Sequence, residues 1–442
     1  MNTNKIIFAV LWGVIVLLVI MLVIQLNRDT QPSQTIQQSW DFSIWLLDIE
    51  EGRFSSIIND FKDQYPEFNR VDISVQSFSD RSIYYDTLIS AIWSWIAPDI
   101  FLVNNKEYSP VLKHTVWVNP DTLSPVDFRR DFLPVFGEDL ISQESDWWPD
   151  FVRWVPVSFQ VPALVYDRRS FPRTSELRDW GRFELEMNTS YERANIPPLA
   201  IWDWTTVSRA ETIFLAFLTQ EWITDISEVQ NSHTRQAFAQ YRSAWEIWIN
   251  SYMSLAESNG RLSDIDHFIE RNVSSLLIYP KDLQTIQQSN YNLNMMFATP
   301  FPLSEWKSST IAIDYDYFTI HQNTANYNIA ENFLSYLASE RWQRKYLEQF
   351  PYNLSAHSAL AVELENQNID QSLNITYWNF LDSQTELVSF QVWRNTLFGQ
   401  GLRDILEREN WFDSSFQLLK SYITCGLSKY RDFENLSRSC ER

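Results

Sequence analysis

Glycine is scarce in this chain, with only 8 among 442 residues. Loops that cradle a phosphate with backbone N–H groups need several closely spaced glycines. Neither the P-loop pattern nor GxGxxG occurs, and the GxSxG motif of serine hydrolases is also absent. The sequence therefore gives no sign of a nucleotide-binding loop or of a serine hydrolase.

Cysteine is scarcer still, and both cysteines, Cys425 and Cys440, lie near the C-terminus. No cysteine stands directly after the apolar N-terminal segment, which excludes a lipoprotein anchor attached through a thiol. The pair fits a disulfide outside the cell as well as it fits two reduced thiols.

Positive charge is also in short supply, since 35 Lys and Arg face 56 Asp and Glu, for a net charge of -21. Nucleic-acid binding needs a basic surface, so we expect no nucleic-acid partner. The five histidines are scattered and form no metal-binding spacing, so we expect no metal and no cofactor. The one acidic–histidine cluster, residues 263–267, is better explained as the start of a solvated helix.

One long hydrophobic run is present, at residues 6–24, and it contains no charge. At 1.5 Å per residue it reaches roughly 28 Å, close to the thickness of a bilayer core. A polar stretch follows, with no small-residue cleavage site before it. We therefore expect residues 1–38 to form an uncleaved single-pass anchor and tether in the cell membrane, with residues 39–442 outside the cell.

The rest of the chain alternates strand and helix patterns. Residues 42–46 predict a strand, Phe54, Ile57, Ile58 and Phe61 share one helix face, and residues 71–75 alternate as a second strand. A second helix leads to the apolar run at 100–103, which is typical of a strand buried on both faces. Strand, helix, strand, helix, strand predicts an α/β fold with a parallel sheet.

The same alternation continues to the end of the chain. Further strands are expected at residues 155–159, 163–166, 274–279 and 310–320, and helices at 207–217, 234–258 and 330–350. The pattern of the tail beyond Pro351 predicts helices.

Four segments in this order resemble the extracellular solute-binding proteins of ABC importers, in the family that carries maltose and glycerol phosphate. They are the strand containing Trp45, the step at 97–100 (APDI), the segment 155–167 (VPVSFQVPALVYD) and the helix at 330–339 (AENFLSYLAS). The resemblance spans roughly residues 42–351. It departs from the family in lacking a lipoprotein signal and in showing tryptophan at several turns where the family tends to have glycine.

This resemblance implies two α/β lobes with a ligand cleft between them. Lobe 1 would comprise about 39–153 and 312–350, and lobe 2 about 154–311 and 351–442, with hinges near 154–156 and 310–315. The implied function is capture of a small polar solute, most simply a sugar, by lobe closure without catalysis, as a monomer that delivers it to ABC permease subunits. Two alternatives stay open: an anchored carbohydrate-active enzyme with two remote carboxylates, and a sensing or adhesion protein with the same fold.

A sugar site needs aromatic faces for stacking and polar groups for the hydroxyls. Core packing is the competing explanation for each aromatic residue, and helix capping is the competing explanation for the threonines. For Asp99, a structural role in the turn after Pro98 is favoured over ligand binding. By their positions at strand ends and helix starts, the expected ligand-binding residues are Trp45, Glu51, Phe78, Asp80, Asn104, Ser158, Phe159, Gln160, Thr205, Thr206, Asp314, Tyr315 and Tyr317.

Tryptophan is abundant where glycine is missing, with 20 Trp against 8 Gly. Average usage of about 7% would give roughly 31 glycines in this chain. Several tryptophans stand where turn chemistry favours glycine, which suggests UGA codons that the organism decodes as glycine. A genuinely tryptophan-rich binding surface is the alternative, and Trp45 and Trp342 fit ordinary aromatic roles under either reading. The candidates are Trp95, Trp154, Trp202, Trp204 and Trp222, with Trp12 beside Gly13 in the same pattern.

Overall fold

The structure is a computed structural model, and the part of the chain that it describes begins at residue 41. The expected anchor and tether (1–38), Thr205, Thr206 and both cysteines lie outside the described residues. No helix within the described part is long and apolar enough to cross a membrane. The described residues are 41–105, 111, 114–142, 150–171, 177, 179–199, 210–223, 236–237, 239, 262–289, 292, 296–302, 310–369, 375–377, 380 and 386–389.

The larger of the two main sheets contains the parallel strands expected from the sequence. β1 pairs in parallel with both β2 and β3, and the crossovers are helices α2 and α3. The last long strand, β11, runs antiparallel to β3 and β7 and parallel to β12. The strands are β1 (Asp41–Leu47), β2 (Asp72–Phe78), β3 (Ile100–Asn104), β4 (Thr115–Val116), β7 (Trp154–Gln160), β11 (Thr310–His321) and β12 (Glu386–Ser389).

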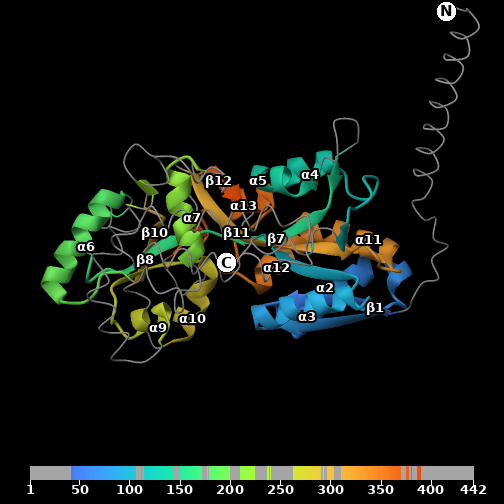
Figure 1. Ribbon diagram of the computed structural model, residues 1–442, viewed down its shortest axis with the longest axis horizontal. Coiled ribbons are helices and arrows are strands. Elements are labelled where there is room, and N and C mark those ends of the chain that lie inside the picture. The colour runs from blue at the N-terminus through green and yellow to red at the C-terminus, as the bar shows by residue number, and fades with distance from the viewer. Residues whose placement is uncertain are drawn as a thin grey trace, which may run out of the picture.

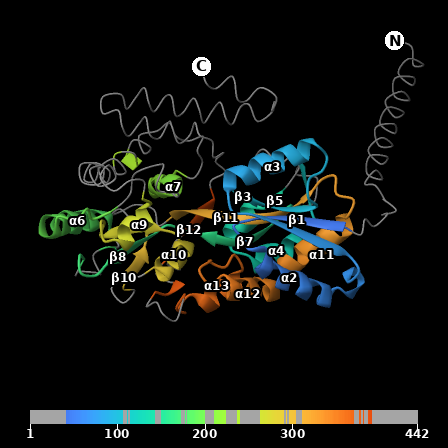
Figure 2. The same ribbon diagram turned by 90° about the horizontal axis from the view of Figure 1, so that it is seen from below.

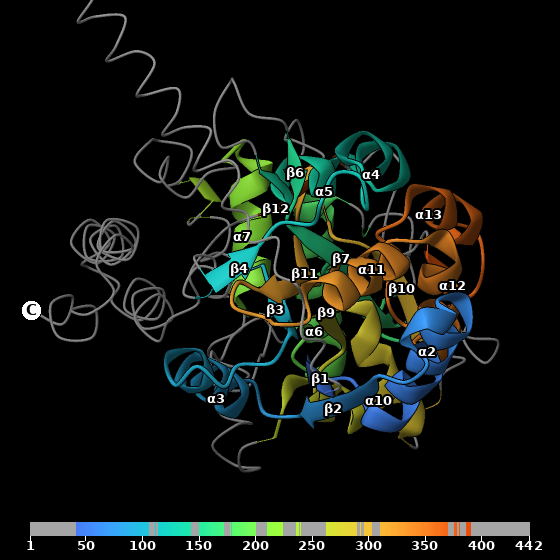
Figure 3. The same cartoon turned by 90° about the vertical axis from the view of Figure 1, so that its right-hand side faces the viewer.

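Helices cover both faces of this sheet. Figures 2 and 3 show α3 on one face and α2, α11 and α12 on the other. The apolar stripe of α2 is buried against the sheet, and Phe54 lies 5.8 Å from the ring of Phe318 on β11. The bounds are α2 (Glu51–Gln64), α3 (Arg81–Trp93), α4 (Pro125–Asp131), α5 (Pro134–Asp139), α11 (Tyr327–Leu337), α12 (Glu340–Gln349) and α13 (Ser358–Leu364).

A second, three-stranded sheet in the order β10-β8-β9 lies at the other end of an elongated molecule (Figure 1). Its strands are antiparallel, and the middle strand β8 is fully buried. This half contains β8 (Ala163–Asp167), β9 (Ser275–Ile278), β10 (Met296–Pro300), α6 (Trp180–Ala194), α7 (Ala210–Gln220), α9 (Asp264–Ile269) and α10 (Leu283–Gln288), while β5 (Ile141–Ser142) and β6 (Phe151–Val152) form a separate hairpin.

Two expectations need correction. The single helix expected at 330–350 is two helices, because Ser339 caps a new start by accepting a hydrogen bond from the Trp342 N–H. The tail contains a strand, β12, where only helix was expected. The strand β7, with which lobe 2 is expected to begin, pairs with β11 in the larger sheet, and the chain passes to the three-stranded sheet at residues 161–162, between β7 and β8.

The segment after Pro351, expected in lobe 2, also begins on the larger sheet's side. Leu354 bridges to Phe159 of β7, and His357 bridges to Phe132. β12, farther along the tail, pairs with the first residues of β11. The region 351–364 thus contacts the larger sheet, and the Tyr352 hydroxyl also bonds Gln287 of α10 in the other half.

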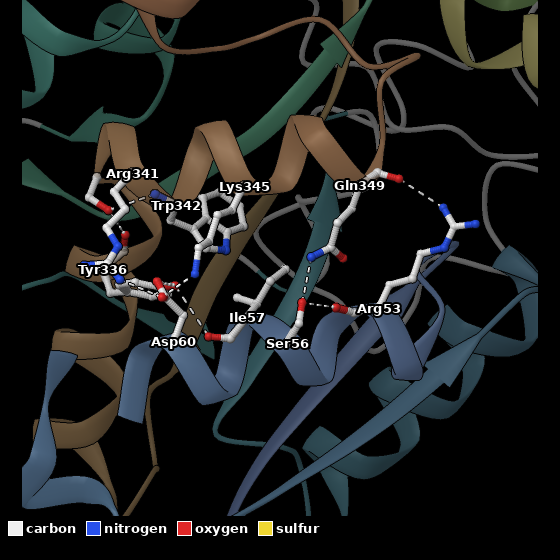
Figure 4. Close-up of polar contacts among 10 residues, drawn as sticks. Arg53, Ser56, Ile57, Asp60, Tyr336, Arg341, Trp342, Lys345 and Gln349 are labelled. Atoms are coloured by element: carbon white, nitrogen blue, oxygen red, sulfur yellow. Dashed lines mark hydrogen bonds and ion pairs between the residues drawn. The ribbon is translucent and has the colours of Figure 1, made fainter. Parts of the chain in front are cut away.

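A buried carboxylate on α2 joins this helix to α11 and α12, which are distant in sequence, as the close-up in Figure 4 shows. Asp60 on α2 accepts hydrogen bonds from the Tyr336 hydroxyl (2.7 Å) and from the Arg341 guanidinium (2.7 Å), and it also pairs with Lys345. Burial by itself raises the pKa of Asp60, but the bonds from Lys345, Tyr336 and Arg341 outweigh it and lower the pKa to about 2. The ionised form therefore stabilises the contact between α2 and the α11–α12 pair.

An Asp60→Asn variant should lose about 2 kcal/mol of unfolding free energy at neutral pH, because one pKa unit is worth 1.36 kcal/mol. The folded pKa is depressed, so the contribution is present above the ordinary Asp pKa of about 3.9 and disappears as the pH falls towards about 2. Urea unfolding of a fragment starting at Ser39, at a series of pH values, measures this. Asp63→Asn, an exposed acid on the same helix, is the control and should change little. A loss in Asp60→Asn that does not shrink with acid would contradict the ion-pair explanation.

Candidate functional site

Strand β11 separates polar from apolar side chains by simple alternation. Ile313, Tyr315 and Tyr317 are buried on one face. Asp314 and Asp316 project from the other face and keep partial exposure. Two carboxylates therefore lie on one face of β11. Figure 1 shows this strand of the larger sheet in the middle of the molecule.

One amide from the neighbouring strand holds both carboxylates. Asn104, the last residue of β3, donates from Nδ2 to Asp314 Oδ1 (2.6 Å) and to Asp316 Oδ1 (3.0 Å). The register places Asn104 directly opposite Asp316. The Asn104 N–H in turn donates to the Tyr85 hydroxyl at 2.9 Å, which ties the site to α3. The carboxylates are thus fixed at the carboxyl edge of the parallel strands, where α/β proteins place their ligands.

The second half of the molecule also contributes to this cluster. The Tyr279 hydroxyl, just after β9, lies 2.9 Å from Asp314 Oδ2 and 2.5 Å from Thr212 Oγ1 on α7. The Lys281 N–H donates to Gln160 Oε1 at 3.2 Å, and Gln160 Nε2 donates to Asn353 Oδ1 at 2.6 Å. Groups from both halves therefore converge on β11.

The positive charges near Asp316 only partly offset the effect of its burial. Burial raises the pKa of Asp316, while the positive charges of Arg81 and Lys281 act in the opposite direction; the nearby Asp314 adds to the rise, and the Asn104 hydrogen bond opposes it. The net direction is upward. A carboxylate that is costly to ionise without a partner gains from hydrogen-bond donors on a ligand.

Several expected site residues lie at or beside this cluster. Asn104 and Asp314 are in it, and Gln160 joins it through Lys281 and Asn353. Ser158 is buried on β7 and bonds the Tyr346 hydroxyl.

The two expected aromatic platforms form a pair at the ends of neighbouring strands. Trp45 on β1 and Phe78 on β2 are half-buried, with ring centroids 5.4 Å apart. Phe78 also packs against Tyr84 of α3, at 5.2 Å. The pair is therefore supported from behind, with part of its surface open.

Three of the expected aromatic residues are core residues instead. Phe159 and Tyr315 both pack against Phe136, and Tyr317 packs against Trp154. All three expected residues are essentially fully buried. The physical reason is the period-two alternation of β7 and β11, which turns these rings to the face opposite the carboxylates.

The two expected acidic residues at helix starts are exposed. Asp80 is the N-cap of α3 and accepts a hydrogen bond from the Ile83 N–H at 2.9 Å. Glu51 occupies the first turn of α2, where a negative charge complements the helix dipole. Local helix stabilisation accounts for both positions.

Asp99 has the structural role expected for it. It accepts hydrogen bonds from the Ser43 N–H (2.8 Å), from Asn326 Nδ2 (3.2 Å) and from the Thr324 hydroxyl. The cluster at 263–267 is also a helix start, in which Ser263 and Asp266 form a capping box, but it is not solvated as expected, because Asp264 and His267 are buried. Across the described ranges, no group of three or more His, Cys, Asp or Glu residues is placed to hold a metal ion.

Sequence reasoning missed Asp316, Tyr279, Lys281 and Asn353. Asp316 could have been predicted from the alternation of the strand, because it lies on the same face as the expected site residue Asp314. Tyr315 and Tyr317 lie on the opposite face. The other three are brought to the cluster by tertiary packing between segments far apart in sequence, which leaves no local signal.

The arrangement is suited to binding a molecule with many hydroxyl groups. It offers carboxylate and amide acceptors, amide, phenol and ammonium donors, and an aromatic pair. A glycosidase places its two carboxyl groups on either side of the scissile bond. Here both carboxylates project from one face of one strand and share one amide donor, an arrangement that favours binding over hydrolysis.

No family model matches this chain, and no curated protein matches it either. Solved structures do match over nearly the whole length. The sugar-binding protein MalE of Xanthomonas citri superposes with a TM-score of 0.69 at 14% identity, covering 88% of this chain and 98% of MalE. An ABC substrate-binding protein of Listeria monocytogenes in complex with cycloalternan gives 0.62 at 13%, covering 88% and 99%. The GacH receptor of Streptomyces glaucescens, solved unliganded and with acarbose, gives 0.62 at 12%, covering 89% and 99%.

These similarities establish the fold. The chain has the two-lobed α/β architecture of the periplasmic-binding-protein type, as its sequence predicts.

Proposed function

We propose that this protein is the extracellular substrate-binding component of an ABC-type importer, which captures a carbohydrate between its two lobes without chemical turnover. The observation that carries the proposal is the polar cluster on β11, where Asp314 and Asp316 meet groups from both halves of the chain. Its support from outside is the fold shared with the sugar-binding protein MalE, with the Listeria ABC substrate-binding protein and with the GacH receptor, which was solved with acarbose.

In this proposal the sugar lies against the aromatic pair Trp45 and Phe78 and hydrogen-bonds the cluster. Apolar sugar faces stack on aromatic rings, while hydroxyls donate to the carboxylates and accept from amides and ammonium groups. The residues proposed to bind are Trp45, Phe78, Asn104, Gln160, Tyr279, Lys281, Asp314, Asp316 and Asn353. Thr205 and Thr206 stay as expectations from the sequence, and the exposed Trp93, Trp95 and Trp222 are left out.

Lobe closure is proposed to hinge where the chain passes between the sheets, at residues 161–162 and in the first half of β11. These are the points at which a few backbone angles change the relative position of two packed units. Tyr279 and Lys281 would then approach Asp314 and Asp316 as the ligand is enclosed.

Asp316→Asn should weaken sugar binding by about ten- to a hundredfold, because a hydrogen bond to a charged acceptor contributes about 1.5–3 kcal/mol. The measurement is calorimetric titration of the fragment starting at Ser39 with malto-oligosaccharides and other sugars, after a thermal-shift screen has selected a ligand. Tyr317→Phe is the matched control: it alters a buried residue on the other face of the same strand and should leave affinity unchanged.

Equal affinity in Asp316→Asn and the parent fragment would contradict this site. Release of reducing ends from the selected sugar would instead favour the carbohydrate-active enzyme.

We also propose that residues 6–24 anchor the protein in the cell membrane as a single span, with the binding domain outside and permease subunits as its partners. The support is the uncharged apolar run and the polar tether after it. An anchored monomer needs no lipid-modified cysteine to stay near the permease.

The full chain should therefore sediment with membranes and require detergent for release, whereas the fragment from Ser39 onward should be soluble and monomeric. Fractionation followed by light scattering tests both parts. A matched control keeps the length of the chain but replaces Leu17 and Leu18 with Asp, which makes insertion of the span costly. Full-length protein in the soluble fraction without detergent would overturn the anchor.

A further inference from the structure

Two helices of this protein end on a tryptophan with left-handed backbone geometry. Trp95 after α3 has φ 62° and Trp222 after α7 has φ 65°. In this region the Cβ of an L-residue crowds its own backbone, and only glycine adopts it freely. Among the described non-glycine residues, the others with positive φ are Asp48, Asn195 and Arg271. Asp and Asn tolerate the conformation, but for a bulky side chain it is an outlier.

The hydrogen bonds identify both positions as the C′ residue of a Schellman motif. The Ile96 N–H bonds the Ala91 carbonyl at 3.0 Å, and the Trp95 N–H bonds the Ile92 carbonyl at 3.3 Å. After α7, the same two bonds run from Ile223 to Leu218 (3.2 Å) and from Trp222 to Thr219 (2.9 Å). C′ of this motif is the position at which helices most often use glycine.

The three glycines among the described residues stand in a different environment. Gly52, Gly137 and Gly181 lie inside α2, α5 and α6, where glycine destabilises a helix, and none of the three has a left-handed φ. Within the described residues, glycine thus occurs at helical positions that do not require it and is missing from the ends of α3 and α7, which favour it. This pattern is independent of the overall excess of 20 Trp over 8 Gly.

Packing does not explain the two tryptophans. Trp95 is 77% exposed and Trp222 is 65% exposed. By contrast, Trp180 and Trp342 are buried among aromatic rings. Trp154, one of the recoding candidates from the sequence, also belongs to this packed group, because it is buried against Tyr317. We therefore leave Trp154 out of the proposal; Trp202 and Trp204 lie outside the described residues.

We propose that residues 95 and 222 are glycine in the native protein, encoded by UGA codons that its organism decodes as glycine and that conceptual translation reads as tryptophan. The buried Trp154, Trp180 and Trp342 are encoded by UGG. The exposed aromatic surface at the end of α3 then shrinks, and the two helices end as unstrained glycine-capped helices.

The direct test is the gene sequence combined with peptide mass spectrometry of the full-length protein from its own organism. UGA at both positions and peptides carrying glycine there are the expected result. UGG at either position overturns the assignment of that residue. UGA codons with tryptophan in the peptides overturn the decoding, and the exposed surface at Trp95 is then native.

A second test uses the full chain in detergent, made from a gene that encodes tryptophan at both positions. Trp95→Gly and Trp222→Gly should each increase the folding equilibrium constant by about five- to thirtyfold by removing left-handed strain. Arg271 occupies the C′ position of a third such motif, after α9. Arg271→Gly therefore measures how much the folding equilibrium constant rises when glycine replaces a residue that is not a candidate for recoding. Trp342→Gly, in the core, should lower the constant. Losses at 95 and 222 similar to that of Trp342→Gly would overturn the proposal.

Discussion

The architecture depends on one strand, β11, which pairs with four other strands of the larger sheet. Its first four residues pair with β12, and its later residues pair with β3 on one side and β7 on the other. Each backbone group on such a strand needs a partner, so its register is fixed along its length. With the register fixed, alternation alone determines that Tyr315 and Tyr317 enter the core and that Asp314 and Asp316 face the region where the two halves of the chain meet.

A partly buried cluster of carboxylates costs hydration free energy, and this cost suggests that the cluster serves to bind a ligand. Burial, together with the neighbouring Asp314, raises the pKa of Asp316 and removes hydration from its carboxylate. Asn104 compensates through its shared hydrogen bonds, and Lys281 and Arg81 supply positive charge. Asp60, by contrast, is fully engaged with three donors and has a depressed pKa, as expected for a structural contact. The incomplete neutralisation at Asp316 is what a hydroxyl-rich ligand would relieve.

Sequence periodicity was sufficient for most of the architecture. The strands at β1, β3, β7, β8 and β11 and the helix faces of α2 and α3 follow directly from period-two and period-3.6 patterns. Serine capping at Ser339 split a helix whose apolar stripe continues across the break. For the site, the alternation of side chains along β11 predicts Asp316, and not Tyr315, as the neighbour of Asp314 on the polar face. Tyr279 and Asn353 were not predictable locally, since contacts more than 30 residues away in sequence bring them to the cluster.

The most direct test of the account is a crystal structure of the fragment from Ser39 onward with a bound oligosaccharide. The account predicts sugar hydroxyls within about 2.7–3.2 Å of the Asp314 and Asp316 carboxylates. It also predicts a pyranose ring against Trp45 and Phe78, with Tyr279 and Lys281 closed over the ligand. A sugar bound elsewhere, leaving both carboxylates without a ligand contact, would contradict it.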